Sequence, residues 1–150
     1  MRKNVNEDEI SFNIGLKNMR QSDNGNLRGT MIQFFNFIEG VKTRYKNLHW
    51  AETVKSRHET IDDFLNEISS FEDELAESYQ GSTSQFNPTD IVGINLPIEC
   101  PVNLATVLKE RVILLRDILD KDPEYVGEVS LIDDFLIKIK KFGSYLMRME

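Results

Sequence analysis

The amino-acid sequence predicts an all-α fold, a four-helix bundle with one long crossover between the second and third helices. Apolar residues recur at spacings of three and four in four segments of the chain. No segment of useful length shows the alternating pattern of a β-strand. The length of 150 residues fits one domain with a single sizeable core, 27–150, preceded by a polar arm.

The first two predicted helices span residues 27–51 and 55–79. Both carry apolar side chains every three or four positions, and Gly81 follows the second segment as a glycine that ends a helix. The one exception to the pattern is Gly40, since an interior glycine costs a helix about 1 kcal/mol against alanine. Because only a few residues separate the two segments, we expect an antiparallel hairpin.

Residues 81–102 form the predicted crossover loop. They include Pro88, Pro97 and Pro101, and proline disfavours helix both at its own position and at the residue before it. Connections in compact domains are typically ~4–6 residues long. The greater length here suits a path along the bundle, so that the helices on either side of the loop run in the same direction.

The last two predicted helices span residues 103–121 and 123–148. Asp122 suits the N-cap of the fourth helix, and Pro123 suits its first position. Glu124 favours the positive end of the helix dipole. These start signals predict that the fourth helix begins after a very short turn.

Residues 1–26 are predicted to form an arm outside the bundle. Their charges are mixed in sign, and the string QSDNGN at 21–26 collects residues that favour turns. We expect an extended or only partly helical segment that is available to order against a partner.

Composition excludes several classes of function. A net charge of −7 and a sequence pI of 4.9 argue against nucleic-acid binding, which needs surplus Lys and Arg. No apolar run reaches the ~18–20 residues of a membrane span, and the first residues lack the apolar stretch of a signal peptide. The single cysteine, Cys100, forms no internal disulfide, which favours a reducing compartment. We therefore expect a cytoplasmic protein with neither nucleic acid nor membrane as a partner.

Both histidines of the chain flank the predicted turn between 27–51 and 55–79. His49 ends the first helix, His58 begins the second, and Asp62 lies one turn beyond His58 on the same face. In an antiparallel hairpin these three residues gather at one end of the bundle. Two imidazoles and a carboxylate suit a first-row transition metal such as iron or zinc.

Asp73 and Glu77 form a second acidic pair further along the same helix. Asp62 and Asp73 are eleven residues apart, roughly 16 Å along a helix. Metal–ligand bonds are only about 2 Å long, so one copy of the helix cannot bring both to one ion. A two-fold axis across the middle of the helix would set Asp73 and Glu77 of one chain opposite the histidines and Asp62 of another. The spacing thus predicts a homo-oligomer with two equivalent sites per dimer.

These motifs resemble the ferroxidase pattern of Dps mini-ferritins. The string NLHW at 47–50, His58-x3-Asp62 and Asp73-x3-Glu77 carry the resemblance. The resemblance implies a ferritin-like bundle in which His49, His58 and Asp62 ligate iron from one chain. Asp73 and Glu77 would ligate the same iron from a partner chain. The implied activity is oxidation of ferrous iron. The nine-residue spacing between the two histidines is shorter than in Dps proteins.

The chain is also similar to uncharacterised ferritin-like proteins encoded by tailed phages, which is the closer resemblance. The shared features are the shorter histidine spacing, a T-x-K-S-like turn at 53–56 and the string A-E-x-Y-Q-G at 76–81. The motifs cover about residues 30–81, with only bundle architecture beyond. This resemblance implies a location in the host cytoplasm or in the virion, and phage structural partners.

Two other functions stay open at this point. The bundle could be a structural or adaptor protein, as in a phage particle, whose metal site is degenerate because the shortened spacing misplaces His49. The 1–26 arm and the 81–102 loop would then be the docking elements. A zinc-dependent hydrolase site at His49, His58 and Asp62 ranks below both, because no general base or substrate pocket is evident.

Overall fold

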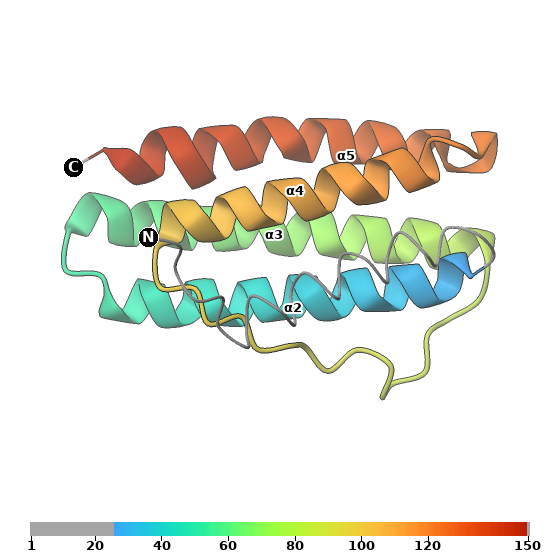
Figure 1. The fold of residues 1–150 in the computed structure, drawn as a ribbon, viewed down its shortest axis with the longest axis horizontal. Helices are drawn as coiled ribbons and strands as arrows, with labels where there is room; N and C mark the ends of the chain where they lie inside the picture. Colours follow the sequence, from blue (N-terminus) through green and yellow to red (C-terminus); the bar gives the residue numbers. More distant parts are fainter. Residues whose placement is uncertain (1–25, 150) are drawn as a thin grey trace, which may run out of the picture.

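The computed structural model describes residues 26–149, and Figure 1 shows that its helices form a bundle. The described residues contain no β-strand, so the predicted all-α class is confirmed. None of their helices is long and apolar enough to cross a membrane. The predicted arm at 1–26 lies outside the described residues except for Asn26. The helices are α2 (Leu27–Ala51), α3 (Lys55–Ser82), α4 (Pro101–Leu119) and α5 (Val126–Lys138).

Short helical pieces flank α5. The 3₁₀ turn η1 (Pro123–Tyr125) precedes it, and the π-helical segment η2 (Ile139–Tyr145) and the 3₁₀ turn η3 (Leu146–Arg148) follow it. The side chain of Asp122 accepts a hydrogen bond from the backbone N–H of Glu124 at 3.0 Å, as the N-cap assignment predicts. In η2, Gly143 packs so closely that a Cβ there would lie 2.6 Å from the Cβ of Ala105.

The end of the second helix, both ends of the third and the start of the fourth differ from the prediction. Helix α4 ends at Leu119 rather than at residue 121, and α5 begins at Val126, after the 3₁₀ turn η1. The second helix does not end before Gly81 but continues to Ser82, because Gly81 is exposed and nothing crowds it. The helix ends where the hydroxyl of Thr83 donates to the carbonyl of Tyr79, at 3.0 Å. Helix α4 begins at Pro101, two residues earlier than predicted, because proline fits the first position of a helix.

The segment between α3 and α4 runs alongside α2 (Figure 1). Near the start of α2, Arg28 donates to the backbone carbonyl of Gln85 at 2.7 Å. Near its end, Arg44 donates to that of Leu96 at 2.6 Å. The segment thus covers most of the length of α2, and α3 and α4 point in the same direction along the bundle (Figure 1).

Asn36 holds the middle of this segment in place. Its side-chain oxygen accepts hydrogen bonds from the backbone N–H groups of Val92 and Gly93, at 2.8 and 2.9 Å. Its side-chain nitrogen donates to the carbonyl of Asp90, at 2.9 Å. Gly93 has a φ of 90°, in the left-handed region that favours glycine. One side chain therefore fixes a turn that has no secondary structure of its own.

Gly40 lets the segment pack closely against the backbone of α2. A Cβ on Gly40 would lie 2.3 Å from the backbone carbonyl oxygen of Ile94, closer than real Cβ atoms come to any neighbour. The exception in the apolar pattern of the first helix therefore has a packing cause. Glycine lowers the helix propensity of α2 at this position, but only a residue without a Cβ lets the segment pack there.

The core lies between the four helices and is made of the apolar stripes that the sequence predicts. Edge-to-face and stacked ring pairs cross it, among them Phe71 stacked on Phe135 with ring centroids 3.9 Å apart. Arg111 is also buried, with its guanidinium carbon 4.7 Å from the centroid of the Phe37 ring. Residues with no exposed surface include Met31, Phe34, Ile38, Val41, Tyr45, Ile61, Phe64, Ile68, Leu75, Leu104, Leu108, Val112, Leu115 and Ile132.

Replacing Gly40 by alanine should destabilise the protein, because the new methyl group meets a backbone atom that cannot move aside. We expect Gly40→Ala to lower the free energy of unfolding by about 1–3 kcal/mol. A matched control is Gly127→Ala, since nothing lies within 4 Å of a Cβ at Gly127 and the change should be neutral or stabilising. Urea denaturation of both variants is the measurement. Equal stability of the two would contradict the close approach.

Candidate metal centre

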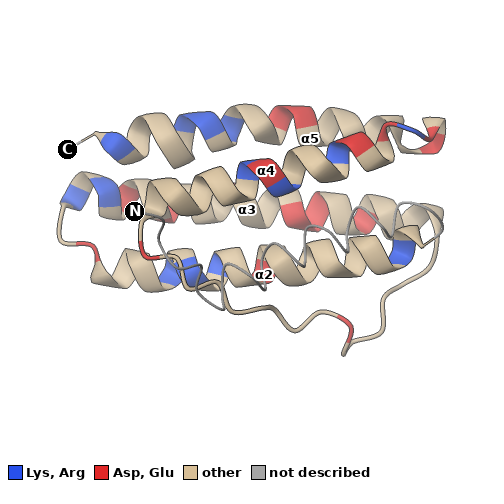
Figure 2. Ribbon diagram, viewed as in Figure 1, with Lys and Arg blue, Asp and Glu red and all other residues tan. Residues whose placement is uncertain are grey.

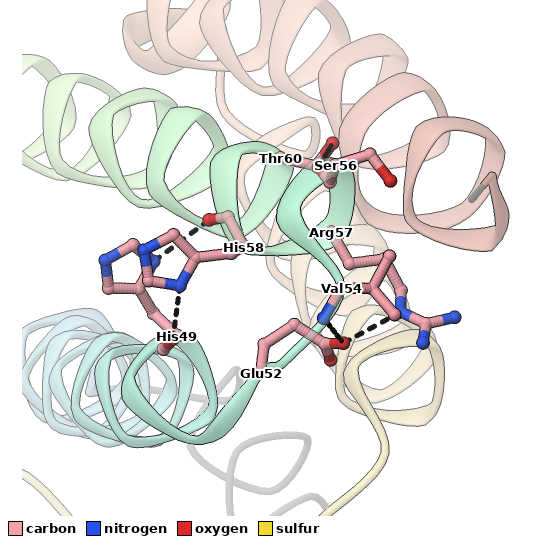
Figure 3. Close-up of polar contacts among 7 residues, drawn as sticks. All are labelled: His49, Glu52, Val54, Ser56, Arg57, His58 and Thr60. Carbon is pink, nitrogen blue, oxygen red and sulfur yellow. Dashed lines mark hydrogen bonds and ion pairs between the residues drawn. The ribbon is translucent and has the colours of Figure 1, made fainter.

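The two histidines come together at the end of the α2–α3 hairpin. His49 lies in the last turn of α2 and His58 in the first turn of α3. Their rings stack, with centroids 3.7 Å apart and planes inclined by 22° (Figure 3). This contact confirms the expectation that both histidines lie at the same end of the bundle.

Each histidine is bonded to the backbone of the other (Figure 3). The Nδ1 atom of His49 lies 2.9 Å from the carbonyl oxygen of His58, and that of His58 lies 2.7 Å from the carbonyl oxygen of His49. A carbonyl oxygen only accepts, so each Nδ1 carries a proton and donates it. In the neutral rings, each Nε2 then has a free lone pair. A donated Nδ1–H with a free Nε2 is the state in which histidine commonly binds metals.

The turn that joins the helices is organised by Glu52. Helix α3 begins after Val54, which has no side-chain oxygen to cap it. An oxygen of Glu52 accepts hydrogen bonds from the backbone N–H of Val54 at 3.1 Å and from Nε of Arg57 at 3.2 Å (Figure 3). Burial acts to raise the pKa of Glu52, but these hydrogen bonds and the charge of Arg57 outweigh it and lower the pKa below 4.5.

Asp62 lies one helical turn after His58, and its side chain is exposed. It lines an open groove of about 430 Å³ between α2 and α3, together with Glu39, Lys42 and Lys46. Among residues 26–149 it makes no salt bridge. Its carboxylate is therefore not committed to a neighbour in the described part of the chain.

Asp73 and Glu77 are also exposed on α3, further from the histidines along the helix.

Glu72, next to Asp73 in the sequence, is buried while Asp73 is exposed. Glu72 is buried against α2, where it accepts a hydrogen bond from Nζ of Lys42 at 2.8 Å. Burial raises the pKa of Glu72, although the Lys42 ammonium acts against it.

The Lys42–Glu72 pair was not predicted from the sequence. The signal was present, because Glu72 lies four residues after Ile68 and three before Leu75 and thus falls on the apolar stripe of α3. Lys42 lies four residues after Ile38 and three before Tyr45, in the same way on α2. A charged residue in such a position on each of two neighbouring helices indicates an internal ion pair.

Within residues 26–149, no group of three or more His, Cys, Asp or Glu side chains of one chain is placed to hold a metal ion. The structure brings His49 and His58 together and leaves Asp62, Asp73 and Glu77 exposed along α3. One chain thus offers two nitrogen donors at the hairpin end. Any third ligand would have to come from a side-chain movement or from another molecule.

Comparisons of the chain with protein-family models, with curated proteins and with solved structures found no match.

The histidine pair should stabilise the hairpin even without metal. His58→Ala removes a ring and a hydrogen bond to the His49 carbonyl, and we expect it to lower the free energy of unfolding by about 0.5–1.5 kcal/mol. His58→Asn keeps an N–H donor near the position of Nδ1 and should restore part of this loss. Urea denaturation in the presence of a chelator measures both. An asparagine variant no more stable than the alanine variant would contradict the role of this hydrogen bond.

Acid should weaken the turn by protonating Glu52. Its pKa is lowered by folding, so the stability it contributes is present above about pH 4.5 and is lost as the pH falls through the lower folded value. We expect Glu52→Gln to be less stable than the wild type at pH 7, with the difference shrinking below pH 4.5. Unfolding curves from pH 7 to pH 3 measure this, with Glu59→Gln as an exposed control. A difference that is the same at every pH would rule out this explanation.

Proposed function

We propose that this protein is a ferritin-like, Dps-related metal-binding protein whose metal site is shared between two copies of the chain. On this proposal, His49, His58 and Asp62 of one copy face Asp73 and Glu77 of the other. Ferrous iron is the favoured ion and would be the substrate of a ferroxidase reaction, with oxygen or peroxide as the oxidant. The observation that carries the proposal is the stacked histidine pair, whose two Nε2 atoms are free.

The arrangement of the helices supports the ferritin-like part of this proposal. In ferritin-like bundles, one long connection lets the second and third helices run in the same direction. Here the segment 83–100 runs alongside α2, and α3 and α4 point the same way (Figure 1). An up-and-down bundle with three short turns would not need a connection of this length.

The chemistry of the histidines supports the metal. A ring that donates Nδ1–H to a carbonyl is held in one orientation and in one tautomer, which prepares Nε2 to donate its lone pair. Imidazole nitrogen suits iron, zinc and copper, and carboxylates complete the coordination and balance the charge. Backbone hydrogen bonds fix the tautomers of both rings, but because the rings are stacked, at least one of them must turn before both Nε2 atoms can bind one ion.

The exposed acids support the sharing of the site between copies. Asp73 and Glu77 make no salt bridge among the described residues, and they are too far along α3 to reach the histidines of their own chain. A two-fold axis across the middle of α3 places them beside the histidines of the second copy. Each dimer would then hold two equivalent sites.

Elemental analysis after incubation with ferrous iron or zinc tests the proposal. The wild type should retain the metal, and His58→Asn, Asp62→Asn and the double variant Asp73→Asn/Glu77→Gln should lose most of it. The matched controls are Asp63→Asn and Glu74→Gln, which change exposed acids next to the proposed ligands and should retain the metal. Metal content that is the same in all variants would contradict the site.

Co-refolding of two variants tests whether the site is shared. In a mixed dimer of His58→Asn with Asp73→Asn/Glu77→Gln, one of the two sites regains every ligand and the other loses both sets. Random mixing should therefore recover about one quarter of the wild-type metal content. Ligands that all came from one chain would give no recovery.

A structural or adaptor role is the second candidate, and a specific observation favours it. The two histidines close the hairpin by bonding each other's backbone, so the pair has a structural purpose that needs no metal. On this alternative, the metal site is vestigial and the bundle serves for packing in a larger particle. Wild-type protein that retains no metal under any condition, with an assembly state unchanged in His58→Asn, would support it.

A further inference from the structure

Charge is unevenly distributed along α5 (Figure 2). Acidic residues lie near its start, at the turn from α4, and basic residues lie near the end of the helical extension that follows it. Residues 135–149 contain no Asp or Glu. The two ends of α5 and its helical extension therefore differ in sign, although the chain as a whole carries a charge of −7.

The basic end presents a face that no other described element covers. We call the exposed residues Ile137, Lys140, Lys141, Tyr145 and Arg148 the basic face. Its three cationic side chains have no carboxylate partner within residues 26–149. Ile137 is 66% exposed and Tyr145 57% exposed, so the cations border apolar surface. Cations around exposed apolar side chains are typical of a contact surface.

The opposite end carries the complementary groups. We call the exposed carboxylates of Asp117, Asp120 and Glu124 the acidic end. Arg116 lies 3.8 Å from Asp120 and balances part of this charge. The apolar side chain among them is Val126, which is 71% exposed.

Helix dipoles account for only part of this polarity. They favour acids at helix starts and bases at helix ends, as Arg116 in the last turn of α4 does. Asp117 and Asp120, however, also lie at the end of α4, and the two Lys and Arg residues of α3, Lys55 and Arg57, lie in its first turn. These four charges oppose the dipoles of their helices.

We propose that the basic face of one copy binds the acidic end of a second copy, so that copies associate head to tail. The two surfaces lie at opposite ends of one bundle and so cannot neutralise each other within one copy (Figure 2). Between copies, three cations meet the three carboxylates of the acidic end, and Val126 meets Ile137 and Tyr145. Such a heterologous contact forms rings or open chains. It uses none of the proposed metal ligands and is independent of the metal site.

Charge-swap variants test the contact by sedimentation velocity. In about 0.05 M salt, the mean mass of the wild type should rise with protein concentration, and about 0.5 M salt should weaken this association by screening. Lys140→Glu/Lys141→Glu and Asp117→Lys/Glu124→Lys should each need at least about tenfold more protein to associate, because like charges then meet. An equimolar mixture of the two variants should associate again, since each altered surface then meets its complement.

The mixture controls for net charge, because both variants keep a negative total charge and would repel each other in the absence of a specific contact. Circular dichroism checks that each variant is folded. A wild type whose mass is independent of concentration and salt, or a mixture that behaves as its separate components, would overturn the proposal. Wild type that stays small but floats with phosphatidylserine vesicles would overturn it too, and assign the basic face to a membrane surface. Both charge-swap variants should keep the metal content of the wild type, because neither changes a proposed metal ligand. A loss of association can therefore be told apart from a loss of the metal site.

Discussion

A three-residue turn between α2 and α3 sets the register of these two helices, and the rest of the bundle packs against the hairpin that they form. The turn is closed from both sides. Glu52 accepts a hydrogen bond from the backbone N–H of Val54 on one side, and on the other each histidine donates to the backbone of its partner. The same register brings Lys42 to Glu72 and the aromatic rings of both helices into contact. The only two histidines of the chain are thus part of its closing contact as well as its best candidate ligands.

The segment after α3 behaves as a fifth element of the bundle although it has no regular structure. Its backbone polar groups are satisfied by side chains of α2, mainly Asn36 and Arg44, rather than by a ladder or a helix. Gly40 lets the two backbones approach each other. A single helix therefore carries both the hairpin and the long connection, and it determines where α4 begins.

Helical periodicity was sufficient to predict the four helices and the meeting of His49 with His58, because both depend on local spacing and on a short turn. It was not sufficient to predict the stop of α3, since Gly81 meets no neighbour and the helix simply continues. The hydrogen bonds of Asn36 and the reciprocal bonds of the histidines depend on which carbonyls face them after folding, and spacing carries no such information. The proposed role of Asp73 and Glu77 in a shared site would depend on a second copy, which one sequence does not describe.

The locked Nδ1 atoms have a consequence for the chemistry of both rings. Each Nδ1–H is committed to holding the helix ends together, so each neutral ring has only Nε2 left to offer to another group. The same two hydrogen bonds thus close the hairpin and select the nitrogen that a ligand would meet.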